Sequence, residues 1–155
     1  MELLNNIWSA LTTPNETLIN LIMLPAAFIE TFLSFLIFTT ILKINTSKKQ
    51  TLTFLTIYSI VILLGLYLIP SPINTFINYI ALCILIHFIF KVSLLQSFFA
   101  SILPTFFFAI VGTLIMNPFF TIFNITYDQS EIIPLYRSIY LIIMYGRIIY
   151  QAHII

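Results

Sequence analysis

The fold is decided by residues 98–116, which read FFASILPTFFFAIVGTLIM. This run holds no charged residue, and its length approaches the roughly 20 apolar residues that a helix needs to cross a bilayer. Its apolar residues are unbroken, whereas the strands of a membrane barrel alternate between apolar and polar positions. An unpaired backbone group in hydrocarbon also costs far more than the weak helix propensity of Ile and Val. The stretch therefore predicts a membrane-spanning helix.

The rest of the chain has the same apolar character. Of its 155 residues, 61% are hydrophobic and only 7% are charged, and the mean hydropathy is +1.10. This composition excludes a water-soluble globule, and the net charge of +1 is too small for binding to nucleic acid. Cys83 is the single cysteine, and no Cys and His residues have the spacing of a zinc site. We therefore expect an all-α integral membrane protein that lies in a lipid bilayer and binds no metal or other cofactor.

Charges, prolines and polar clusters divide the chain into five apolar segments that are each long enough to span a membrane. These segments cover residues 18–42, 52–69, 73–90, 92–116 and 132–150. Pro25 and Pro104 lie inside two of them and are expected to kink the helix, because proline lacks an amide hydrogen. Residues 14–155 are thus predicted to form one polytopic membrane domain.

Residues 1–13 predict an element of another kind. Apolar residues fall on one helical face and polar residues on the other, as is typical of a helix that lies in the membrane interface. The apolar face holds Leu3, Leu4, Ile7, Trp8 and Leu11. Glu2 and the absence of basic residues argue against a secretory signal peptide. We expect a short interfacial amphipathic helix that is anchored by Trp8.

The lysines determine the predicted orientation, because Lys and Arg in short loops remain cytoplasmic. Lys43, Lys48 and Lys49 follow the first segment, and Lys91 follows the third. Placing both loops in the cytoplasm puts the N-terminus and the predicted loop 117–131 outside the cell. The C-terminus then lies in the cytoplasm.

Glu30 lies in the middle of the first segment, where a charged residue costs about 2.5–3.5 kcal/mol. An intramembrane carboxyl group is a candidate ion site, proton relay or ligand contact. The structural alternatives are a protonated carboxyl group or an ion pair with Arg137 or Arg147. Cys83 and His87, one helical turn apart, form a weaker candidate as a nucleophile and its base.

Several stretches carry a resemblance to a known family. They are FIET (28–31), FTTIL (38–42), IPSP (69–72), FIFKVSLLQS (88–97), GTLIMNP (112–118) and FNITY (123–127). In these stretches the chain resembles the N-terminal multi-pass sensor region of Agr-type receptor histidine kinases, which occur in low-GC Gram-positive bacteria. The resemblance implies a quorum-sensing receptor in a bacterial cell membrane, whose outer parts bind a peptide and signal to a cytoplasmic kinase of a two-component system.

The candidate ligand contacts are Tyr127, Asp128 and Glu131 in the predicted outer loop, together with Glu30 in the membrane. The three loop residues equally suit an ordinary solvated loop. The resembled family continues into a phospho-accepting histidine and an ATP-binding domain, whereas this sequence stops at Ile155. We therefore expect an isolated sensor region with no catalytic residues, which forms a homodimer or pairs with a full-length receptor kinase.

Two other functions remain open. A small transporter or substrate-binding membrane subunit would use Glu30 near the kinks at Pro25 and Pro104 as a midplane site, although the sequence has no inverted repeat. An Agr-type membrane cysteine peptidase would use Cys83 and His87, although in that family the histidine precedes the cysteine. A purely structural membrane protein is also compatible with the sequence.

Overall fold

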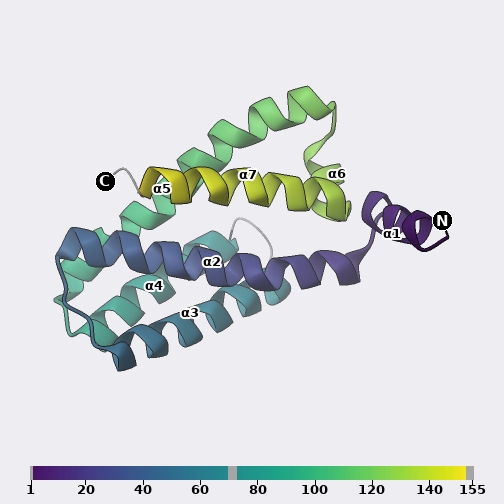
Figure 1. Ribbon diagram of the computed structural model, residues 1–155. Coiled ribbons are helices and arrows are strands. Elements are labelled where there is room, and N and C mark those ends of the chain that lie inside the picture. The colour runs from purple at the N-terminus through teal and green to yellow at the C-terminus, as the bar shows by residue number, and fades with distance from the viewer. Residues whose placement is uncertain (1, 70–72, 153–155) are drawn as a thin grey trace. The chain divides into compact units, whose positions relative to one another are not determined.

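The computed structural model describes residues 2–69 and 73–152, with side chains described for residues 3–69 and 73–146. Every regular element in these ranges is a helix, which confirms the predicted all-α fold (Figure 1). The helices are α1 (Glu2–Thr12), α2 (Glu16–Leu42), α3 (Lys48–Leu68), α4 (Ile73–Phe90), α5 (Leu94–Phe123), α6 (Tyr127–Ile132) and α7 (Pro134–Ala152).

Four of these helices, α2 to α5, are long and apolar enough to cross a membrane. They correspond to the first four predicted spans, and α4 has the predicted bounds. The predicted end of the fourth span at Met116 is wrong, because α5 continues through Asn117 and Pro118 to Phe123. Phe119 explains the extension, since it is buried and packs against Phe123 and against Tyr140 of α7.

The predicted fifth span corresponds to α7, which is amphipathic and is not among the four helices that are apolar enough to span by composition. It packs antiparallel to the second half of α5. Tyr136 lies near Phe123, with ring centroids 6.4 Å apart, and Tyr140 lies near Phe119, with ring centroids 6.0 Å apart. Tyr140 is buried while Ile142 is exposed. On α7, Leu141 and Met144 are buried as well, whereas Ile142 and Ile143 are exposed.

The chain divides into two compact units, and each is described by itself. One unit comprises residues 1–26 and 109–155, and the other comprises residues 27–108. In the first unit, α1 and α6 both pack against α7. In the second unit, α3 and α4 pack against each other as an antiparallel hairpin.

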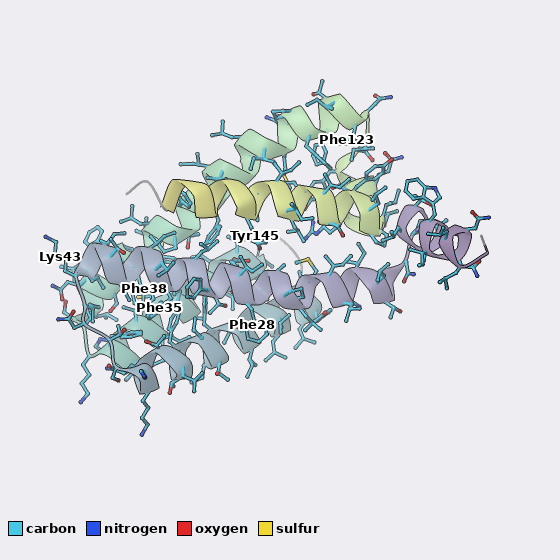
Figure 2. The ribbon with its side chains drawn as sticks, viewed as in Figure 1. Phe28, Phe35, Phe38, Lys43, Phe123 and Tyr145 are labelled. Carbon is cyan, nitrogen blue, oxygen red and sulfur yellow. The ribbon has the colours of Figure 1, made fainter. Side chains whose placement is uncertain are left out.

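The second unit is built around four phenylalanine rings, here called the phenylalanine cluster: Phe35, Phe38, Phe54 and Phe90. Their ring centroids lie 5.1 to 6.2 Å apart, which is the range of favourable aromatic contacts. Figure 2 shows Phe35 and Phe38 on the part of α2 that leads to Lys43. The cluster therefore fills the end of this unit that carries its lysines.

The same end of the unit is fastened by polar contacts. Ser47 and Gln50 form a capping box, in which each side chain accepts a hydrogen bond from the backbone amide of the other residue. This cap starts α3 at Lys48, so the predicted start at Leu52 is wrong. The Gln50 amide group also donates to the carbonyl oxygen of Ile89 at 2.9 Å, which joins the start of α3 to the end of α4.

Gly65 lies at the opposite end of this hairpin. A Cβ atom added at Gly65 would collide with the carboxamide oxygen of Asn74 and would lie 3.1 Å from that of Asn78. The missing side chain therefore allows two asparagine side chains of α4 to pack against the backbone of α3. Close approach of this kind is common where membrane helices meet.

We expect the substitution Gly65→Ala to lower the free energy of unfolding by about 1–3 kcal/mol, as overpacking does elsewhere. The measurement is the denaturation midpoint of the purified protein in detergent micelles. Gly146→Ala is the matched control, because a Cβ atom there has no neighbour within 4 Å. The double variant Gly65→Ala, Asn74→Ala should recover most of the loss, and equal stability of Gly65→Ala and Gly146→Ala would contradict the proposed contact.

Candidate functional site

The candidate outer site is built on α6, a short helix between α5 and α7 (Figure 1). Asn124 has a positive φ of 51°, and this residue reverses the chain after α5. Thr126 and Gln129 then form a capping box that starts α6. Part of the predicted loop 117–131 is therefore helical. The pattern of Thr followed three residues later by Gln is the sequence signal that indicates this start.

Tyr127 and Glu131 are brought together because they lie one helical turn apart on α6. The Tyr127 hydroxyl donates a hydrogen bond to the Glu131 carboxylate. This hydrogen bond, together with partial burial and the negative charge of Glu131, raises the pKa of Tyr127 to about 12. The ring of Tyr127 remains 45% exposed. The pair thus presents an aromatic face and a carboxylate at the surface of the protein.

Asp128 is exposed in the first turn of α6, beside this pair. Arg137, on α7, completes the cluster, because its positive charge acts on the Tyr127 hydroxyl. From the sequence, Arg137 is expected to lie at the membrane interface or to pair with Glu30, and not to join this cluster. The sequence does place Arg137 close to α6, since this residue lies in the first turns of the helix that directly follows α6.

Tyr127, Glu131 and Arg137 are here called the outer cluster, after the predicted outer loop. This cluster is connected to α2 in two places. The backbone amide of Asn15 donates to the carbonyl oxygen of Ile132 at 3.2 Å, which ties the start of α2 to the end of α6. The Nε atom of Arg137 lies 3.4 Å from the sulfur atom of Met23, which ties α7 to α2. These two contacts join α6 and the start of α7 to a helix that is apolar enough to span a membrane.

Glu30 belongs to the other unit and has different neighbours. It is half-buried in the middle of α2, and its carboxyl group acts electrostatically on the hydroxyl of Tyr58 in α3. Next to this pair, the Ser59 hydroxyl donates to the Thr31 hydroxyl at 3.1 Å, and both residues are fully buried. The described contacts of Arg137 are with Met23 and Tyr127, and the side chain of Arg147 lies outside the described residues.

Cys83 and His87 have separate surroundings. Cys83 is buried, and the Nδ1 atom of His87 lies 2.7 Å from the carbonyl oxygen of Val92, where it fastens the turn between α4 and α5. Among the residues that the structure describes, no group of three His, Cys, Asp or Glu residues could hold a metal ion. The geometry therefore gives His87 a structural contact and shows no assembled catalytic pair in the described residues.

We expect the substitution Glu131→Gln to lower the pKa of Tyr127 toward the ordinary tyrosine value of about 10, because it removes the carboxylate that binds the phenol. The measurement is the alkaline absorbance titration of tyrosinate, taken as the difference from a Tyr127→Phe variant. The stabilisation linked to this contact should be complete below about pH 10 and lost as the pH rises through about 12, since the folded-state pKa is the higher one. Asp128→Asn is the matched control, and an unchanged titration in Glu131→Gln would refute the contact.

No family model, curated protein or solved structure matches this chain.

Proposed function

We propose that this chain is the membrane-embedded sensor region of an Agr-type two-component receptor, and that it binds an extracellular peptide at α6. The observation that supports it best is the cluster of Tyr127, Glu131 and Arg137. Two of these residues lie on α6, which connects α5, a helix apolar enough to span the membrane, to α7, the helix that carries Arg137. In this proposal the N-terminus lies outside a bacterial cell membrane and the lysine-rich loops lie in the cytoplasm.

The chemistry of the cluster suits a peptide. A carboxylate accepts hydrogen bonds from an amino group or backbone amides, and a guanidinium group donates to carbonyl or carboxylate oxygens. The exposed ring of Tyr127 offers a flat apolar surface with little conformational freedom to lose on binding. Asp128, which is exposed beside the ring, adds a second negative charge that favours a cationic or N-terminal group of the peptide.

Signal transmission would use the contacts of α2. A peptide that draws Glu131 or Arg137 toward itself displaces the helices that carry them. The hydrogen bond between Asn15 and Ile132 and the contact between Arg137 and Met23 then pull on α2. Ligand binding would thus shift the arrangement of the spanning helices, which a partner kinase reads at the cytoplasmic side. The chain acts in this proposal as a receptor and not as an enzyme.

The test uses Trp8, which is the only tryptophan and lies on α1, a helix that packs against α7. The protein in lipid nanodiscs is titrated with a library of short synthetic peptides, each in linear and cyclised form, and Trp8 fluorescence is recorded. We expect at least one peptide to give a saturable change. Glu131→Gln should weaken that binding by about tenfold, the effect of one charge-assisted hydrogen bond.

The control variant for this experiment is Glu16→Gln, which neutralises another exposed carboxylate outside the cluster. It should bind with the affinity of the parent protein. The proposal is abandoned if no peptide gives a saturable change, or if Glu16→Gln and Glu131→Gln weaken binding equally.

A small transporter is the second candidate function, because Glu30 and Tyr58 form a polar pair near the middle of their helices. Uptake of a solute by proteoliposomes that contain this protein, abolished by Glu30→Gln, would favour the transporter over the receptor. The cysteine peptidase has less support, since Nδ1 of His87 contacts a backbone carbonyl oxygen.

A further inference from the structure

The interior of residues 27–108 contains a group of polar side chains at the centre of the spanning helices. We call it the midplane polar cluster, and it consists of Glu30, Thr31, Tyr58 and Ser59. Glu30 and Thr31 lie near the middle of the 27 residues of α2, and Tyr58 and Ser59 lie near the middle of the 21 residues of α3. Such groups are rare at this depth, and they commonly mark ion or proton sites.

A hydrogen bond assembles this cluster. The Ser59 hydroxyl donates to Thr31 at 3.1 Å, and less than 2% of either residue is exposed. This contact holds α2 and α3 at a fixed register at the centre of the membrane. It thereby places the neighbouring residues Glu30 and Tyr58 close enough for their side chains to interact electrostatically.

Glu30 is the only acidic residue between positions 27 and 108, and the basic residues of this unit are far from it. Lys43 follows Glu30 by 13 residues, which corresponds to about 20 Å along a helix. Lys48, Lys49, Lys91 and His87 lie at the same end of the helices as Lys43. No basic side chain of this unit therefore neutralises the carboxylate. An ionised carboxylate without a partner is too costly in hydrocarbon to persist.

Apart from Glu30, the lysines and His87, the helices of this unit carry only phenol and thiol groups that can titrate. They are Tyr58 and Tyr67 on α3, and Tyr79 and Cys83 on α4. Of these, Tyr58 is the one that Glu30 acts on. A phenol donates a hydrogen bond but carries no positive charge, so Tyr58 leaves the charge of an ionised Glu30 unbalanced.

The midplane polar cluster has different neighbours on its two sides. At the lysine end, the phenylalanine cluster follows the midplane polar cluster directly, since Phe54 stacks on Tyr58 with ring centroids 5.5 Å apart. At the other end, the carboxamide oxygens of Asn74 and Asn78 are buried without a hydrogen-bond partner beside Gly65. Gly65 lies two helical turns from Tyr58, and both are buried on α3. Among the described residues, buried polar groups without a partner thus lie on the Gly65 side of the midplane polar cluster, whereas aromatic rings adjoin it on the lysine side.

We propose that the midplane polar cluster binds a monovalent cation, either a proton or an alkali metal ion, on the carboxyl group of Glu30. The hydroxyl groups of Tyr58, Thr31 and Ser59 supply the neighbouring oxygen atoms. The cation exchanges with solution through the end of the hairpin that carries Asn74 and Asn78. The inference concerns a different site from the outer cluster, so it stands or falls independently of the proposed peptide receptor.

The test measures the thermal unfolding midpoint of the full chain in nanodiscs. One series varies the pH in a choline salt, and a second adds lithium, sodium or potassium chloride at a fixed alkaline pH. A bound cation stabilises the folded state as its concentration rises above its dissociation constant. We therefore expect the midpoint to rise with acidification, which identifies a proton, or with one of the alkali ions, which identifies a metal ion.

The decisive variant is Glu30→Gln, which keeps the size of the side chain and removes its charge. It should have a midpoint that is independent of both pH and alkali ions in the same range. Glu16→Gln is the matched control on the same helix, and it should keep the dependence of the parent protein. Tyr58→Phe should fold and should shift the half-maximal pH or ion concentration, because it removes a neighbouring hydroxyl group.

Three outcomes would overturn the proposal. The first is a midpoint of the parent protein that responds to neither pH nor alkali ions. The second is an equal response in Glu30→Gln. The third is a response that Arg137→Gln abolishes as completely as Glu30→Gln does, since Glu30 would then be paired with an arginine.

A measurement on the parent protein covers the case in which Glu30→Gln fails to fold. Infrared spectra report the stretching band of a protonated carboxyl group directly. The band should persist at neutral pH and disappear on alkalinisation if the cation is a proton. If an alkali ion binds instead, the carboxylate bands should shift when that ion replaces choline, and spectra that change in neither way would overturn the proposal.

Discussion

Hydrocarbon offers no hydrogen-bond partner to a peptide group, so each backbone amide and carbonyl group in the membrane has to be bonded within its own helix. All other features of this protein follow from that constraint. The helices α2 to α5 associate through their side chains. In lipid the hydrophobic effect does not drive this association, because the apolar side chains are already out of water. Tight ring packing, as in the phenylalanine cluster, and a few polar contacts, such as that between Ser59 and Thr31, determine which helices meet.

The polar groups are arranged differently in the two units. In residues 27–108, polar groups are enclosed between helices, and the hydrogen bonds there fix register at the centre and at the lysine end. In the other unit, the polar groups gather where α6 meets α2 and α7, and they leave part of Tyr127 exposed. An enclosed site suits a small ion, whereas an open one suits a larger ligand. The two proposed sites thus differ in how far the described residues enclose them.

Much of the fold could be predicted because length and hydropathy alone identify a spanning helix. Four predicted spans match α2 to α5, whereas the ends of helices depend on local contacts that hydropathy does not report. The capping box of Ser47 lengthens α3, and the burial of Phe119 extends α5 past a proline. In the candidate outer site, Tyr127 and Glu131 could be proposed as ligand contacts because they lie in the predicted outer loop. Arg137 is close to α6 in the sequence, but its interaction with Tyr127 depends on how α7 packs against α6.

The antiparallel packing of α5 and α7 also bears on how the chain enters the membrane. Arg137 and several tyrosines make α7 less apolar than the helices before it, so α7 partitions weakly into lipid on its own. The ribosome synthesises α5 before α7. The ring of Phe119 is then present as a surface against which Tyr140 of α7 can pack. We therefore expect α7 to insert into the membrane together with α5, as a helical hairpin. The last helix of the described chain depends on its predecessor for its topology.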